Sequence, residues 1–192
     1  EEVLMQFLVF KNFSLPKSID NYNMSIINRN FSKRKVIKNN LLKFFNPAYG
    51  LYGNLYSLYT LPAPLFTGFK HTHNAQSFLK STFNDVWEKE FDFLDLTCKY
   101  KFRDFENVNQ YLLHHWQIVQ GKIAPTNLRK DRVRYDLDLI HSKKVSEYIR
   151  QKVKRMICIN DEENLIEPFE VMKEQFISDF AYILPEKSSF EK

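Results

Sequence analysis

The chain has 192 residues, of which 44% are hydrophobic and 27% are charged, and its formal net charge is +5. These values are typical of globular proteins and exclude the disordered and fibrous classes. The two cysteines, Cys98 and Cys158, are too few for a disulfide framework or a zinc site, and they favour a reducing compartment. No apolar run approaches the roughly 20 residues that a membrane span requires.

The first third of the chain is rich in aromatic residues and lysines. Residues 1–31 alternate apolar patches with turn formers, and the one short strand that they suggest is Met24–Ile27. Ser32 is a plausible N-cap, which predicts a helix running to Phe45. Residues 46–72 predict an ordered, partly helical connector that packs by its aromatic rings. The helix expected between Ser32 and Phe45 should bury Val36, Ile37, Leu41, Leu42, Phe44 and Phe45.

Two long amphipathic patterns follow in the middle of the chain. Apolar residues at helical spacing predict a helix over 76–96 and a second helix over 106–120, which Gly121 ends. His114 and His115 lie inside the second pattern beside Trp116, which favours a packing role for both histidines.

The last third of the chain predicts strand, helix, strand and helix in that order. Residues 133–139 alternate apolar and polar, as in a half-buried strand. A helix over 142–155 follows, then a short apolar run at 156–159 that is typical of a buried strand, and a helix over 166–184 that ends at Pro185. This order predicts a mixed, helix-rich α/β fold.

Basic residues are densest at 32–38 and 143–155, both on predicted amphipathic helices. A solvated helix face is the simpler interpretation, and contact with nucleic acid or lipid is the alternative.

Four short polar segments carry the candidate chemistry, and the first contains His73. His71 and His73 lie two positions apart, just before the expected helix, and we do not expect them to form a metal pair. His73 could accept a proton from a hydroxyl nucleophile or donate a hydrogen bond to a phosphate. A loop histidine satisfied by the backbone is the alternative. Gln76 follows it at the expected start of a helix.

The second segment holds two cations. Lys101 and Arg103 share one side of an extended segment, with Phe102 turned toward the core. The guanidinium of Arg103 matches phosphate oxygens and stays charged at any working pH. A surface ion pair with Asp104 or Glu106 is the competing interpretation.

The third and fourth segments lie on either side of the last helix. Asn160 and Asp161 follow the buried strand directly, at the end where α/β folds tend to bind ligands. Asp161 could hold a divalent cation, most simply Mg²⁺, that bridges phosphates, and an Asn-Asp turn is the alternative. Lys187 and Ser188 form an anion-binding candidate near the C-terminus, and Phe190 is expected to anchor that tail.

These segments, in this order, resemble the Stealth family. That family comprises hexose-1-phosphate phosphotransferases of bacterial capsule synthesis, and it includes animal N-acetylglucosamine-1-phosphotransferase. Its third conserved block resembles Phe66-Thr67-Gly68-Phe69 through His73, Gln76-Ser77-Phe78 and Phe102-Arg103 to Asn107-Val108-Asn109-Gln110. Its fourth block resembles Met156-Ile157-Cys158-Ile159-Asn160-Asp161 and Leu184-Pro185-Glu186-Lys187-Ser188-Ser189-Phe190-Glu191.

The resemblance implies transfer of a sugar-1-phosphate unit from a UDP-sugar to a saccharide hydroxyl, with release of UMP. It implies His73, Arg103 and Asn160 as catalytic residues and Asp161 as the ligand of a divalent cation, Mg²⁺. The candidate substrate- or phosphate-binding residues are Lys101, Gln76, Lys187 and Ser188. The partners implied are a UDP-sugar donor and a saccharide acceptor, with no nucleic acid, at the periphery of the membrane-bound capsule machinery. The low cysteine count and the lack of a signal-like segment favour a bacterial, cytoplasmic member of the family over a lumenal animal one.

The family's first and second conserved blocks have no counterpart between residues 1 and 192. We therefore expect this chain to be the C-terminal part of a single Rossmann-like catalytic domain and to be inactive alone. The alternative from another class is a non-catalytic basic and aromatic module that binds acidic polysaccharide or nucleic acid.

Overall fold

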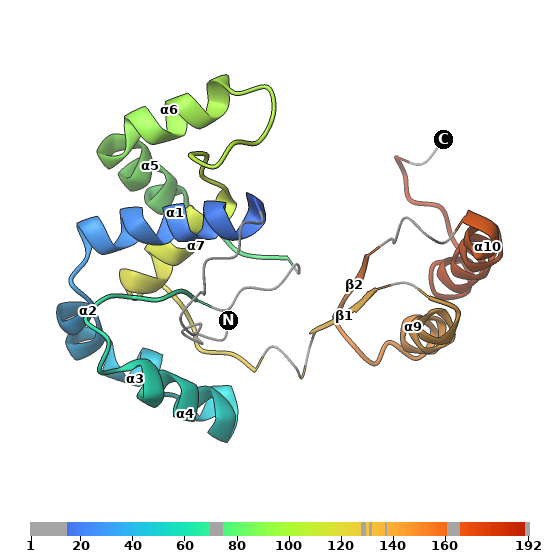
Figure 1. The fold of residues 1–192 in the computed structure, drawn as a ribbon. Coiled ribbons are helices and arrows are strands. Elements are labelled where there is room, and N and C mark those ends of the chain that lie inside the picture. The colour runs from blue at the N-terminus through green and yellow to red at the C-terminus, as the bar shows by residue number, and fades with distance from the viewer. Residues whose placement is uncertain are drawn as a thin grey trace. The chain divides into compact units, whose positions relative to one another are not determined.

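The computed structural model describes residues 15–69, 75–127, 130, 132–136, 138–160 and 166–190. Figure 1 shows a helical N-terminal part and a C-terminal part that contains two strands. The described chain divides near Asn127 into two compact units. The fold is therefore mixed α/β and rich in helix, as expected.

The first unit is a helical cluster built around α7, which spans Gln110–Val119. Every residue of α7 after Gln110 is buried, and α7 packs against α1 and α5. Trp116 donates from Nε1 to Asp85 at 2.7 Å, and its ring meets that of Phe31 edge to face. Around α7 lie α1 (Leu15–Asn30), α2 (Lys33–Asn39), α3 (Leu41–Phe44), η1 (Pro47–Tyr49), α4 (Gly50–Thr60), α5 (Lys80–Lys89) and α6 (Phe91–Lys99).

The expected strand at Met24–Ile27 is wrong, because these residues lie within α1. Ile19, Asn23, Ile26 and Ile27 are all buried, and their spacing is that of one helix face. The core side of α1 includes a polar residue, Asn23, whose amide donates to Asn109 Oδ1 at 2.7 Å. This polar position interrupts the apolar pattern that marks a helix in sequence.

Two expected helices are each divided into two. The helix that follows Ser32 breaks at Asn40. Val36, Ile37 and Phe44 are buried, as predicted. The predicted burial of Leu41 and Leu42 is wrong, because both side chains are exposed. The helix expected over 76–96 begins at Lys80 and breaks at Glu90, which separates α5 from α6.

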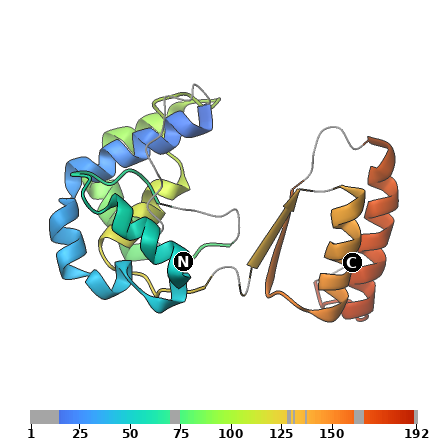
Figure 2. The same ribbon diagram turned by 60° about the horizontal axis from the view of Figure 1, so that its bottom comes forward.

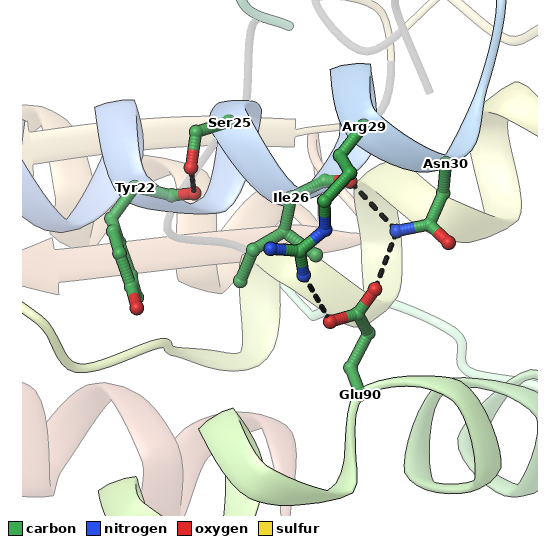
Figure 3. A network of polar contacts seen from close by, with 6 residues as sticks. All are labelled: Tyr22, Ser25, Ile26, Arg29, Asn30 and Glu90. Atoms are coloured by element: carbon green, nitrogen blue, oxygen red, sulfur yellow. Dashed lines mark hydrogen bonds and ion pairs between the residues drawn. The ribbon is translucent and has the colours of Figure 1, made fainter.

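The break at Glu90 coincides with a buried polar contact (Figure 3). The Glu90 carboxylate pairs with Arg29 and accepts from Asn30 Nδ2 at 2.5 Å, so both donors come from the end of α1. Asn30 Nδ2 also donates to the Ile26 carbonyl at 2.9 Å. This network joins α1 to the junction between α5 and α6.

The connector over 46–72 is ordered and partly helical in its described part, as predicted, but only some of its rings pack inward. Tyr49, Phe66 and Phe69 are buried, whereas Tyr52, Tyr56 and Tyr59 are exposed on α4. The Lys33 ammonium donates to the carbonyls of Thr60 and Ala63 at 2.6 and 2.7 Å, which satisfies the C-terminal end of α4. Burial lowers the pKa of Lys33.

The second unit contains β1 (Arg132–Asp136), α9 (Leu139–Gln151), β2 (Met156–Asn160) and α10 (Ile166–Ile183). The two strands are parallel, with Arg132 opposite Met156 and Asp136 opposite Asn160. Figures 1 and 2 both show α9 and α10 on one side of this pair, where α9 packs against β1 and α10 packs against α9. β2 is half-buried to exposed, so the expected full burial of that strand is wrong.

Among the described residues, no helix is both long and apolar enough to cross a membrane.

Candidate functional site

The carboxyl ends of β1 and β2 bring two polar side chains together. Asp136 and Asn160 are the last residues of their strands and lie opposite each other in the parallel register. Asn160 Nδ2 donates to Asp136 Oδ1 at 3.1 Å, and Arg134 NH2 donates to the same oxygen at 2.8 Å. A polar pair at this end of parallel strands lies where α/β folds commonly bind ligands.

The local sequence explains this pairing. β1 alternates partly buried and exposed residues, and β2 is the apolar run that ends in Asn160. A parallel pair needs a crossover connection, and α9 supplies it. The prediction that Asn160 lies at the carboxyl end of a strand is confirmed, whereas Asp136 was not among the predicted site residues. An acidic residue at the end of the neighbouring strand, in the position that matches Asn160, is the signal that could have identified Asp136.

A second polar group follows β1 at the start of α9. Asp138 Oδ1 accepts from the His141 backbone N–H at 2.6 Å, and Asp138 Oδ2 lies 2.6 Å from His141 Nδ1. The Tyr135 ring lies 5.2 Å from the His141 ring. These contacts cap α9 and hold the imidazole against β1.

The fourth polar segment follows α10. Lys187 is exposed and Ser188 is half-buried. The expected anchor is wrong, because Phe190 is 84% exposed.

The cations of the second segment lie in the first unit, after α6. Lys101 and Arg103 are both exposed, and Lys101 Nζ lies 5.5 Å from the Phe102 ring centroid. Phe102 is 76% exposed, so its expected burial in the core is wrong. No described residue forms an ion pair with Arg103, and the alternative pairing with Asp104 or Glu106 is therefore not formed. The guanidinium remains available to a ligand.

Gln76 lies in the extended segment that precedes α5 and is half-buried. The side chain of Gln117 in α7 holds this segment: Leu79 N donates to Gln117 Oε1 at 3.0 Å, and Gln117 Nε2 donates to the Ser77 carbonyl at 3.4 Å. Gln76 is thus attached to the core of the first unit rather than placed at a helix start.

His71, His73 and Asp161 lie outside the described residues. The pairing of His73 with Arg103 and the placing of Asp161 beside Asn160 stay predictions. The described candidates fall on both units, with Gln76, Lys101 and Arg103 on the first and Asn160, Lys187 and Ser188 on the second.

The two mid-helix histidines pack in the core, as expected. His114 and His115 are each 2% exposed. The Phe69 ring lies 5.2 Å from the ring of His115, and the Phe78 ring lies 6.2 Å from that of His114. Aromatic packing on both rings places them away from any solvent-facing site.

The side chains at the strand ends carry the type of oxygen ligand that a hard cation binds. Asp136 offers a carboxylate and Asn160 an amide oxygen, which are ligands that Mg²⁺ accepts together with substrate phosphates. Within the described ranges, no group of three or more His, Cys, Asp or Glu residues is arranged to hold a metal ion. A cation at this edge would therefore need further oxygen ligands, such as water and substrate phosphates.

Comparison with known proteins finds relatives among polysaccharide phosphotransferases. Capsular polysaccharide phosphotransferase WcwK of Streptococcus pneumoniae is 39% identical over 175 residues, which cover 88% of this chain and 50% of the relative. Exopolysaccharide phosphotransferase cps2G of Lactiplantibacillus plantarum is 34% identical over 170 residues (88% and 49%). Receptor polysaccharide phosphotransferase WefC of Streptococcus oralis is 32% identical over 176 residues (88% and 49%).

The chain spans about half the length of the curated relatives it matches. No protein-family model matches the sequence. No solved structure matches it either.

Proposed function

Because the chain belongs to the Stealth family of polysaccharide phosphotransferases, we propose that it takes part in transferring hexose-1-phosphate from a UDP-sugar to a saccharide hydroxyl, with release of UMP. The product would be a capsular or other cell-surface polysaccharide. One observation carries the proposal: 39% identity over 175 residues to a capsular polysaccharide phosphotransferase. The exposed cation of Arg103 and the polar pair at the strand ends add chemistry of the required kind.

Transfer requires an acceptor oxygen to attack the phosphorus that bears the sugar while the bond to UMP breaks. In the proposed arrangement, His73 takes the proton of the acceptor hydroxyl or donates a hydrogen bond to a phosphate oxygen. The Arg103 guanidinium binds the phosphate oxygens on which negative charge is concentrated. The exposure of Arg103 and its lack of a partner among the described residues support this role.

The strand-end residues are proposed to bind the rest of the donor. Asn160 orients a phosphate or hydroxyl, and its hydrogen bond to Asp136 limits the rotation of its amide. Asp161 would be the carboxylate ligand of Mg²⁺, which when bound would neutralise phosphate charge. Lys101, Gln76, Lys187 and Ser188 are proposed as further contacts to substrate or phosphate. In this proposal, the β1–α9–β2 unit belongs to a larger Rossmann-like sheet.

We further propose that both units act within one catalytic domain and that turnover needs the part that the relatives have beyond the matched region. The half-length coverage of those relatives supports this view. We place the enzyme in the bacterial cytoplasm, peripheral to the membrane.

The proposal is tested by UMP release from a panel of UDP-hexoses with Mg²⁺ and a capsule oligosaccharide acceptor. The complete product of the gene is assayed beside the 192-residue chain. Arg103→Ala and Asn160→Ala are each expected to lower kcat by about 10²–10³-fold, as the loss of one group that stabilises transition-state charge typically does. Lys122→Ala and Asn84→Ala are matched controls, because both side chains are exposed and outside the candidate site.

Three outcomes are informative. Loss of UMP release in the site variants but not in the controls, with all variants folded, supports the proposal. Equal activity of the site variants and the parent overturns the site assignment. Absence of UMP with every donor and acceptor overturns the reaction and favours a binding module, whose affinity for acidic polysaccharide would fall steeply with salt.

A further inference from the structure

The helix α4 presents an apolar face to solvent. Gly53, Ser57 and Thr60 are its buried positions, so small residues face the protein. The outward positions hold leucine and tyrosine, and all of these are exposed: Leu51, Tyr52, Leu55, Tyr56, Leu58 and Tyr59. This arrangement reverses the usual pattern of a surface helix, and exposed apolar patches of this kind mark interaction sites. We call these six residues the α4 face.

The α4 face is open and hollowed, with a volume of about 640 Å³ lined by five of its six residues. α4 has 11 residues, which corresponds to a length of roughly 16 Å, or about half of a bilayer's hydrocarbon core. A helix of this length can lie along an interface but cannot cross it.

The sequence around α4 has no carboxylate. Between Asp20 and Asp85 there is no aspartate or glutamate, whereas there are eight lysines and arginines. Arg34, Lys35 and Lys38 on α2 are exposed, and no described residue pairs with them. Arg29 is paired with Glu90, and the exposed cations of α2 carry positive charge that no described carboxylate pairs.

α2 and α4 are held together at their ends. The buried Lys33 in the first turn of α2 donates to carbonyls at the C-terminal end of α4. Arg34 and Lys35 follow Lys33 directly in the chain, so their backbone lies near the C-terminal end of α4. Figures 1 and 2 both show α2, α3 and α4 grouped in one region of the first unit.

We propose that the α4 face and the cations of α2 bind the surface of an anionic lipid bilayer. Leucine side chains enter the acyl boundary, tyrosines place their rings there and their hydroxyls in the headgroup layer, and the cations meet the lipid phosphates. The absence of carboxylates from 21–84 removes the repulsion that such a surface would exert. The inference deepens the proposed peripheral location, and its test needs no turnover.

The test is flotation of the 192-residue chain with vesicles of phosphatidylcholine alone or mixed with phosphatidylglycerol, at low and high salt. We expect binding to the anionic vesicles that weakens with salt. A charge variant, Arg34→Gln with Lys35→Gln and Lys38→Gln, is expected to weaken binding roughly a hundredfold, at about fivefold for each cation. An apolar variant, Tyr52→Ser with Leu55→Ser and Tyr59→Ser, is expected to abolish it.

Matched controls remove the same kinds of group elsewhere. Lys122→Gln with Lys130→Gln and Lys143→Gln removes three exposed cations, and Phe102→Ser with Phe105→Ser and Phe190→Ser removes three exposed rings. Both control sets are expected to bind as the parent does. Because the charge variant alters only exposed side chains, it remains informative if the apolar variant fails to fold.

Failure of the parent to float with anionic vesicles overturns the inference, and so does binding that the controls weaken as much as the variants. A dimer that the apolar variant dissociates, without vesicle binding, would assign the α4 face to a second copy of the chain instead. None of these outcomes bears on UMP release, so this inference and the proposed function can fail separately.

Discussion

Arg29 at the end of α1 forms an ion pair with Glu90 at the junction of α5 and α6. The two partners differ in exposure, since 4% of the Glu90 side chain is exposed against 53% of that of Arg29. The guanidinium also lies 4.8 Å from the Phe93 ring centroid. The pair therefore has one member in the protein interior and one that water reaches.

This asymmetry predicts that losing Arg29 is worse than losing the charge of Glu90. Arg29→Ala leaves a buried carboxylate with Asn30 as its remaining described donor, and we expect a loss of about 3 kcal/mol in the free energy of unfolding. Glu90→Gln leaves a guanidinium that water can solvate, and we expect about 1 kcal/mol. Urea denaturation measures both, with the exposed Arg34→Ala as control. The reverse order would show that the pair is not a buried-carboxylate contact.

Gly121 ends α7 with a φ of +70° and lies against Asn40. A Cβ at Gly121 would overlap the Asn40 amide, whereas a Cβ at Gly50, with a φ of +68°, would meet nothing within 4 Å. Gly50→Ala is expected to cost about 1–3 kcal/mol through the backbone alone, because a φ of +68° with a ψ of 179° is essentially restricted to glycine. Gly121→Ala is expected to cost roughly 1 kcal/mol for its positive φ and at least 1 kcal/mol more for the overlap with Asn40. Thermal unfolding measures both variants.

The overlap has its own control. Asn40→Ser combined with Gly121→Ala should be less destabilised than the sum of the two single changes, because the shorter side chain makes room. A double variant destabilised by the full sum of the two single changes would contradict the contact.

Two carboxylates make folding stability sensitive to acid. Burial alone would raise the pKa of Asp85, but hydrogen bonds from Lys89, Trp116 and Gln120 outweigh it, so the pKa lies below 3.8. Burial would also raise the pKa of Asp179. Hydrogen bonds from Ser146, Arg150 and Gln175 outweigh this effect, so the pKa of Asp179 is lowered too. As pH falls below 3.8, the unfolded chain takes up protons first, and the free energy of unfolding decreases through the lowered pKa values.

The measurement is urea denaturation at about pH 5 and about pH 2.5. Asp85→Asn should lose less stability than the parent between these two conditions, because its contribution no longer titrates. Glu88→Gln is the control, since Glu88 is exposed on the same helix. An unchanged acid dependence in Asp85→Asn would rule out the lowered pKa.

Asp136 and Asp138 are two residues apart, but we expect them to have different roles. Asp136 holds the Asn160 amide, so Asp136→Ala should lower phosphotransfer about 10–100-fold with little change in stability, as the loss of an orienting partner commonly does. Asp138 caps α9, so Asp138→Ala should lower the free energy of unfolding by about 1 kcal/mol. UMP release and urea denaturation of both variants separate the roles. A loss of stability in Asp136→Ala as large as in Asp138→Ala would make Asp136 a structural residue.

The sequence predicts those elements whose burial follows a simple period. The helix of α7 is recognised because Leu112, Trp116 and Val119 recur at helical spacing, and β1 is recognised by its alternation. α1 is missed because Asn23 stands on its buried face, where its partner is Asn109, 86 residues away. The break between α5 and α6 is missed for the same reason, since Glu90 is buried by partners on α1. Contacts distant in sequence leave no periodic signal.

The candidate site is predicted to a similar degree. Asn160 is found because it directly follows an apolar run, and Arg103 is exposed as a phosphate-binding cation would need to be. Asp136 is missed because only the parallel register sets it opposite Asn160. Phe102 and Phe190 are mispredicted as buried because aromatic character alone does not determine whether a ring faces the core.

The small residues on the inner side of α4 have a consequence for local unfolding. Gly53, Ser57 and Thr60 bury little apolar area, so the ends of the helix carry much of its attachment: Asn46 and Asn54 exchange hydrogen bonds of 3.0 and 2.9 Å at one end, and Lys33 binds the other. Helices with few buried apolar contacts open more readily than those at the core. Amide hydrogens of α4 should therefore exchange with deuterium before those of α7. We also expect α4 to shift against its neighbours while the rest of the first unit stays folded.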